Sequence, residues 1–268
     1  MPVVADVGRF YRLGVAVRGV GDGPATWFVD ELGAEVAGTN PEPGDSHRTT
    51  MLHLGPTAVA LFAAADDDTT GTIGRYLDRF GAGLHSLAWR VDDLQGAEDA
   101  LLARGVTITG VNREARHFFL HPKETFGILI ELTDQGAGQP RRNTLGTGLV
   151  REMAWMTAVV RDLSVAADSL AELFGAETVT GLPAGSPTVE RTLDLGIGDV
   201  VLRLVEPISA ESRYSLFAAE VGERLHSVAL RVDDLDAVPF PLVERLDERA
   251  WSNPSDTLGL RLEWVRTP

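Results

Sequence analysis

The carboxylates best suited to chemistry in this sequence stand inside apolar runs. Glu131 lies in ILIEL and Glu263 in LRLEWV, where a carboxylate can act as an acid, a base or a hydrogen-bond acceptor. Burying a charged group without a partner is costly, so we expect Glu131 to be paired or protonated. Arg12 and Arg90 are candidate partners for a salt bridge, and such a structural role is compatible with a catalytic one.

Two histidines nearby have a spacing that could suggest a metal site. His117 and His121 form the pattern HxxxH, which can clamp one ion when it lies on a helix. The intervening FFL predicts a strand instead, along which four residues span roughly 13 Å, too far for a single ion. We therefore expect His117 to face a pocket or solvent and His121 to begin the turn HPKE.

The strands and helices that position these side chains come from an internal duplication of the sequence. The string LHSLAWRVDDL at 84–94 recurs as LHSVALRVDDL at 225–235, with nine of eleven positions identical. Weaker similarity extends to both flanks. The pattern predicts a unit of one strand, one helix and two or three strands, used four times at about 10–64, 84–133, 152–206 and 225–266.

The expected helix boundaries follow from local chemistry. Glycines at 33 and 175 predict the C-terminal ends of two helices. The aspartates of each VDDL suit a helix N-terminus through capping and the helix dipole. In the fourth unit Pro239 and Pro241 interrupt the pattern, so we expect its helix to start late or to be distorted.

The strings HSLAWRVDDL and HPKETFGILIEL resemble the vicinal-oxygen-chelate superfamily, which includes glyoxalases, bleomycin-resistance proteins and extradiol dioxygenases. The second string is similar to the last strand of methylmalonyl-CoA epimerases. The resemblance implies an α+β fold, with four βαβββ units forming two glyoxalase-like open-barrel domains. We expect a first domain at 1–137 that holds the working pocket, a linker at 138–149, and a second, structural domain at 150–268.

The resemblance also implies positions for a divalent metal, such as Fe, Mn, Co, Ni or Zn, held by His and carboxylate ligands. The matching positions are, in the first half, Arg12, Ala60, Ser86 and Glu131, and in the second half, Trp155, Arg203, Ser227 and Glu263. Only the two glutamates match the superfamily pattern, so we expect no metal cofactor. One alternative stays open, in which a strand register shifted by one residue brings His85 to the ligand position.

The function expected from these residues is metal-independent binding of a small aromatic or polar organic molecule, as in resistance proteins that sequester drugs. Besides Glu131, the ligand-contacting residues would be Arg12, Ser86, Trp89, Arg90, His117, Trp155, Arg203, Ser227 and Glu263. Pairing of Arg203 with Glu263 could replace the metal. The alternative is an isomerase, epimerase or lyase that uses Glu131 as acid or base, although HRTTMLHL at 47–54 offers no second carboxylate. A metal-dependent dioxygenase is a third possibility.

The composition limits the classes of chemistry and of binding partner that we expect. The 268 residues carry a net charge of −15 and no cysteine, which excludes thiolate nucleophiles and cysteine-held metal clusters. A strongly negative chain repels nucleic acid and anionic membranes and favours cationic ligands. No apolar stretch is long enough to cross a bilayer and no secretory signal is visible, so we expect a cytoplasmic protein. We expect a small-molecule ligand as the partner. The sequence leaves open whether the protein forms a homodimer.

Overall fold

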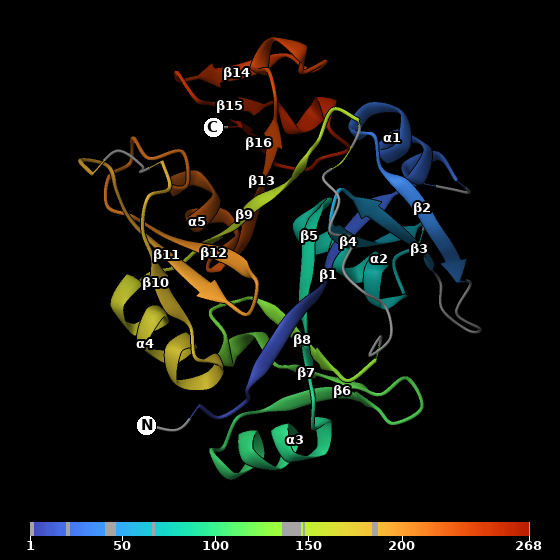
Figure 1. Cartoon of the computed structure of the whole chain (residues 1–268), viewed down its shortest axis with the longest axis vertical. Coiled ribbons are helices and arrows are strands. Elements are labelled where there is room, and N and C mark those ends of the chain that lie inside the picture. Colours follow the sequence, from blue (N-terminus) through green and yellow to red (C-terminus); the bar gives the residue numbers. More distant parts are fainter. Residues whose placement is uncertain are drawn as a thin grey trace. The chain divides into compact units, whose positions relative to one another are not determined.

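The fold consists of two mixed eight-stranded sheets, one built from each half of the sequence. The computed structural model describes residues 3–19, 22–40, 47–65, 68–135, 146, 148–183 and 187–267. The strand order is β2-β3-β4-β1-β5-β8-β7-β6 in one sheet and β10-β11-β12-β9-β13-β16-β15-β14 in the other (Figure 1). The second order repeats the first strand for strand. The predicted α+β class and its four strand-rich repeats are confirmed.

The first half contains two of these repeats, joined by helix α2. Its elements are β1 (Val7–Arg18), α1 (Gly23–Leu32), β2 (Glu35–Asn40), β3 (His47–Leu54), β4 (Thr57–Ala64), α2 (Thr72–Phe80), β5 (Gly83–Val91), α3 (Leu94–Ala103), β6 (Ile108–Asn112), β7 (His117–Leu120), the 3-10 turn η1 (Pro122–Glu124) and β8 (Leu129–Thr133).

The second half repeats this order, with a longer first helix, a shorter second helix and a 3-10 turn in place of α3. Its elements are β9 (Glu152–Val159), α4 (Leu163–Phe174), β10 (Glu177–Val179), β11 (Glu190–Ile197), β12 (Val200–Pro207), α5 (Ser215–Val221), β13 (Arg224–Val232), the 3-10 turn η2 (Leu235–Ala237), β14 (Leu242–Arg245), β15 (Arg249–Ser252), the 3-10 turn η3 (Pro254–Asp256) and β16 (Leu262–Arg266).

The predicted helix boundaries are confirmed in three repeats. Gly33 and Gly175 end α1 and α4 in the left-handed conformation, with φ of 74° and 67°, which costs a residue without a Cβ nothing. Asp93 begins α3 by accepting a hydrogen bond from the backbone N–H of Gly96. Capping by the first VDDL therefore works as its sequence indicates.

The fourth repeat departs from the expectation, because it forms only the 3-10 turn η2 where a distorted helix was predicted. Proline supplies no backbone N–H for a helical hydrogen bond, and Pro239 and Pro241 come shortly after the turn. The residue between them, Phe240, stacks on Trp264 at 5.8 Å and lies 5.6 Å from Trp27 of α1, measured between ring centroids. Aromatic packing thus supplies part of the apolar cover that a helix would give.

Contacts divide the chain into two compact units. The first unit takes 1–11, 86–139 and 155–226, and the second takes 12–85, 140–154 and 227–268. In the first unit α4 packs against β11 and β12 (Figure 1). The domain bounds 1–137 and 150–268 stay a prediction, and most of the expected linker at 138–149 lies outside the described residues.

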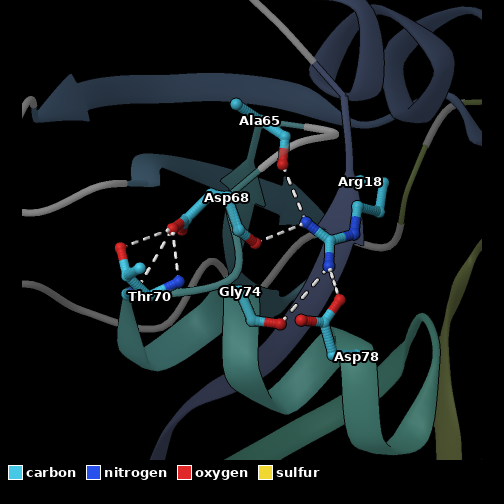
Figure 2. A network of polar contacts seen from close by, with 7 residues as sticks. Arg18, Ala65, Asp68, Thr70, Gly74 and Asp78 are labelled. Atoms are coloured by element: carbon cyan, nitrogen blue, oxygen red, sulfur yellow. Dashed lines mark hydrogen bonds and ion pairs between the residues drawn. The ribbon is translucent and has the colours of Figure 1, made fainter.

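Within the second unit, one arginine joins the end of β1 to α2 and to the loop before it (Figure 2). Arg18 Nη1 donates to the carbonyl oxygens of Ala65 and Asp68, both at 2.8 Å. Its Nη2 donates to the carbonyl of Gly74 at 3.3 Å and pairs with Asp78. The side chain of Asp68 also accepts backbone N–H groups at the start of α2. Both terminal nitrogens of Arg18 thus hold this loop and α2 against the end of β1.

Candidate functional site

The residues around Glu131 share one face of three adjacent strands. In the register of β5 and β8, Ala88 lies opposite Glu131 and Arg90 lies opposite Thr133. In the register of β7 and β8, His117 lies opposite Thr133. Side chains alternate between the two faces of a strand, so residues paired in this way point to the same side. Ser86, Phe119 and Leu129 lie on this face by the same register.

The central pair on this face is a carboxylate beside an imidazole. Glu131 is 1% exposed, and its Oε1 lies 3.8 Å from Nδ1 of His117. The side chain of His117 is 21% exposed, so it connects the buried carboxylate with a more open position. Imidazole is the side chain whose ordinary titration falls closest to neutral pH. The pair therefore brings together two side chains whose chemistry allows each to accept a proton.

The turn before β8 fixes where Glu131 starts its strand. Thr125, which is fully buried, donates its hydroxyl to the carbonyl of Ile128 at 2.5 Å. The next two residues, Phe126 and Gly127, have left-handed φ of 54° and 76°. A non-glycine residue held in this region costs local energy and persists only where the surroundings impose it. This turn therefore enters β8 in one defined register.

His121 belongs to that turn and not to a metal site. Its Nδ1 accepts a hydrogen bond from the backbone N–H of Lys123 at 3.2 Å, and the predicted strand between it and His117 is β7. Hydrogen bonding by Thr107 lowers the pKa of Glu124 below its ordinary value. Glu124 is thus a carboxylate that stabilises the turn.

The second half repeats this construction with a different partner for the glutamate. Thr257 donates its hydroxyl to the carbonyl of Leu260 at 2.6 Å, and Leu258 has a φ of 53°. Glu263, fully buried on β16, accepts from Arg249 Nε at 2.5 Å. In strand register Arg249 occupies the position that His117 has in the first half. Arg249 was missed in the sequence, although a charged residue beside the apolar AW was its signal.

A third buried pair lies on β11 and β12. Nε and Nη2 of Arg203 donate to the two carboxylate oxygens of Asp194 at 2.7 and 2.9 Å. The guanidinium carbon lies 4.3 Å from the ring centroid of Trp155, which is a cation–π contact. The structure thus gives Arg203 and Glu263 partners other than each other. Asp194 was also missed, and its signal was a carboxylate within the alternating TLDLGI.

The remaining candidate residues are placed as follows. Trp89 lies on the face of β5 opposite to Ala88, donates its indole N–H to the carbonyl of Ile197 at 3.1 Å and stacks near Phe174. This placement favours packing over ligand contact. Ser227 is buried on β13, and Arg12 is half-buried on β1.

The register shift that would turn His85 toward the metal position does not occur. Ser86, and not His85, pairs with Leu129 in an unbroken parallel register. His85 lies edge-on to Tyr76 and Phe62, at centroid distances of 4.8 and 5.4 Å. The second half has the same arrangement, in which His226 lies between Tyr214 and Phe217 at 4.7 and 4.8 Å. Both histidines are therefore packed between aromatic rings.

The donor set does not fit the superfamily's catalytic metal. Among the described residues, no group of three or more His, Cys, Asp or Glu side chains is placed to hold an ion. At the metal positions Arg203 already pairs with Asp194, and Glu263 with Arg249. A guanidinium carries a permanent positive charge and is a poor neighbour for a cation.

An enclosed cavity lies in the apolar core of the second unit. Its volume is about 20 Å³, room for about one water molecule. Its lining residues are Leu13, Val15, Phe28, Leu32, Leu54, Thr57, Val59, Leu84, Met153, Val228, Leu230, Leu260 and Leu262. None of the candidate residues lines it, so we treat it as a packing defect. In the described part of the chain, no helix is long and apolar enough to span a membrane.

Residues 17–132 match the model of the glyoxalase/bleomycin resistance protein/dioxygenase superfamily, a stretch that holds both His117 and Glu131. This part of the chain belongs to that superfamily. Superfamily members bind small molecules, which supports a small-molecule ligand at that general level.

Two curated relatives are epimerases, and each aligns with about half of this chain. The ethylmalonyl-CoA/methylmalonyl-CoA epimerase of Cereibacter sphaeroides is 28% identical over 133 residues, covering 47% of this chain and 97% of the relative. The mitochondrial methylmalonyl-CoA epimerase of Mus musculus is 29% identical over 136 residues, covering 48% of this chain and 74% of the relative. Their similarity thus accounts for one half of the duplication.

A solved structure covers both halves. A mutant of 4-hydroxymandelate synthase from Streptomyces coelicolor has a TM-score of 0.71 with this chain at 16% identity, covering 98% of this chain and 92% of that one. At this identity the likeness shows the fold alone, including its tandem arrangement.

Proposed function

We propose that this protein is an enzyme that moves a proton at a carbon atom next to a carbonyl group of a small acyl compound, without a metal, and that Glu131 is its base. The observation that carries the proposal is the buried Glu131 carboxylate 3.8 Å from the partly exposed His117 imidazole. The similarity to epimerases supports the reaction class, because epimerisation is a proton transfer at such a carbon. The proposal takes up the enzymatic alternative from the sequence rather than simple binding.

Comparison of the three buried pairs supports placing the chemistry in the first half. Asp194 and Glu263 are each paired with an arginine, whose guanidinium stays protonated at any physiological pH. Glu131 is paired with a histidine, which can release and take up a proton. Of these three pairs, the one on β7 and β8 contains an imidazole in place of a guanidinium.

The proposed reaction begins with the Glu131 carboxylate taking the proton of the substrate carbon. The C–H bond breaks, its electron pair moves onto the carbonyl as an enolate, and the proton becomes bound to a Glu131 oxygen. His117 can accept that proton and return it or exchange it with solvent. Ser86 and Arg90 lie on the same face of β5 and can donate hydrogen bonds to the developing negative charge.

A single base distinguishes this proposal from epimerisation by two opposed carboxylates. The strand β3, which carries a second glutamate in the epimerases that the sequence resembles, has no carboxylate here. Reprotonation must therefore use the same Glu131–His117 pair. Proton exchange with solvent, or isomerisation on one face of the substrate, follows more directly than full inversion.

Deuterium exchange tests the proposal, with methylmalonyl-CoA as the first probe because the relatives are named for it. The whole protein is incubated with the thioester in deuterium oxide, and mass spectrometry follows deuterium uptake. We expect the wild type to accelerate exchange and Glu131→Gln to lose at least about 100-fold of that rate, the usual contribution of a general base.

Glu114→Gln is the matched control, since Glu114 is an exposed carboxylate in the same repeat. It should exchange at the wild-type rate. Exchange that survives in Glu131→Gln would contradict the assignment of the base. Absence of exchange in the wild type would exclude this substrate class. Metal-free binding of a small molecule would then explain the structure better than catalysis.

A further inference from the structure

Arg203 offers a hydrogen-bond donor that no described residue accepts. Two of its three nitrogens are taken by Asp194, and one face of its guanidinium is stacked on Trp155. The third nitrogen, Nη1, is buried and has no hydrogen-bond partner within the described ranges. Arg203 is 1% exposed, so bulk solvent does not reach this donor.

A second donor of the same kind lies beside it. Thr157 on β9 pairs in register with Arg203 on β12, so the two side chains point to the same face of the sheet. Thr157 is fully buried, and its hydroxyl also has no partner among the residues that the structure describes. Asp194, Arg203 and Thr157 thus form one polar row across β11, β12 and β9.

The row is held in place by groups that do not compete for these donors. Asp194 accepts two hydrogen bonds from one edge of the guanidinium, in the bidentate geometry typical of arginine and carboxylate. These bonds fix the plane of the guanidinium. Trp155 holds the plane from one face. A buried donor left unpaired carries its full desolvation cost, whereas valine has nearly the shape of threonine and would carry none at 157. The row therefore has two donors that are available to an acceptor.

The charges on the row define what it accepts. Asp194 neutralises Arg203, which leaves two donors and no net charge. Such a site suits a planar group with oxygen acceptors and at most one negative charge. It suits neither a doubly charged phosphate nor an ammonium group, which only donates.

We propose that Arg203 Nη1 and the Thr157 hydroxyl form a metal-free binding site for the carboxylate or carbonyl oxygen of a small organic molecule. The site is independent of the proposed proton transfer, since it lies on the second sheet and does not use Glu131. It also reverses the expectation from the net charge of −15, which favoured a cationic ligand.

Acetate and acetamide test this site, because they share the planar oxygen group and differ in charge. Saturation-transfer NMR on the whole protein measures their binding, with methylammonium chloride as a probe that only donates. We expect at least one of the two acceptors to bind, and Thr157→Val to weaken that binding about tenfold, the effect of losing one hydrogen bond. Tighter binding of acetate would indicate that the site takes a carboxylate, and tighter binding of acetamide would indicate that it takes a neutral carbonyl group.

Thr57→Val is the matched control. Thr57 is also a buried threonine whose hydroxyl lacks a partner within the described ranges, but it lies in the other compact unit and lines the apolar cavity. Both valine variants should unfold at or above the wild-type temperature, because each loses a buried unpaired hydroxyl. Only Thr157→Val should lose ligand binding.

A double variant, Arg203→Met with Asp194→Leu, removes the donor without leaving a lone buried charge. It should fold by circular dichroism and lose acetate and acetamide binding. The proposal is overturned if neither acceptor binds the wild type, if Thr157→Val binds as the wild type does, or if methylammonium binds as tightly as the acceptors.

Discussion

At the residue scale, the two halves differ in which basic side chain is paired with the buried glutamate. His117 accompanies Glu131 in the first half, and Arg249 accompanies Glu263 in the second. A guanidinium paired in the interior is a fixed structural contact, whereas an imidazole can take part in proton transfer. The same scaffold position thus holds a guanidinium in one half and an imidazole, for which we propose a catalytic role, in the other.

Replacing that imidazole should slow the reaction without unfolding the protein. In His117→Asn the side chain still fills the partly exposed position but can no longer accept a proton from Glu131. We expect deuterium exchange into methylmalonyl-CoA to slow by about 100-fold, since a proton partner contributes this much in other enzymes. His121→Asn is the control, because His121 serves only the turn. Equal loss in both variants would mean that the effect comes from folding.

The chemical types at the site could be predicted from the sequence, but their partners could not. Glu131 was recognisable as a carboxylate in an apolar strand, and His117 as a strand residue. Asp194 and Arg249 were missed because strand pairing, and not sequence distance, brings them to Arg203 and Glu263. A one-residue change of register would have reversed every face, so the pairs became visible only with the register.

At the scale of elements, a repeated turn positions both glutamates. Thr125 and Thr257 each close the turn that precedes the glutamate strand, by donating to a carbonyl three residues later. Repetition of the same hydrogen bond in both halves gives an internal control for its contribution to catalysis.

Removal of the hydroxyl from either turn should cost similar stability. We expect Thr125→Val and Thr257→Val each to lower the free energy of unfolding by about 1–2 kcal/mol, the cost of one buried hydrogen bond. Urea unfolding measures this cost. Only Thr125→Val should also slow deuterium exchange, because its turn sets the entry of β8. If Thr257→Val slowed exchange as much, the reaction would depend on general stability or on the second half.

Most elements were predictable, because the repeats, the glycine stops and the aspartate caps are local signals. The fourth helix was the exception. Its two prolines signalled distortion, but the complete replacement by a 3-10 turn depends on Phe240 finding Trp264 and Trp27. Those contacts join residues far apart in the chain, and no local pattern encodes them.

At the scale of the whole molecule, the compact units do not follow the duplication. The first unit combines most of the second and third repeats, and the second unit combines most of the first and fourth. Sequence periodicity shows which face of a strand or helix is apolar, but not which other repeat covers it. The duplication was therefore predictable, and the grouping of its repeats was not.

The central claim is that proton transfer in this superfamily member depends on Glu131 and not on a metal. Its most direct test is deuterium exchange into methylmalonyl-CoA by protein treated with EDTA, measured before and after addition of Mn²⁺ or Co²⁺. We predict that the chelated protein keeps the full exchange rate and that neither ion raises it. Exchange that is lost with EDTA and restored by either ion would contradict the claim.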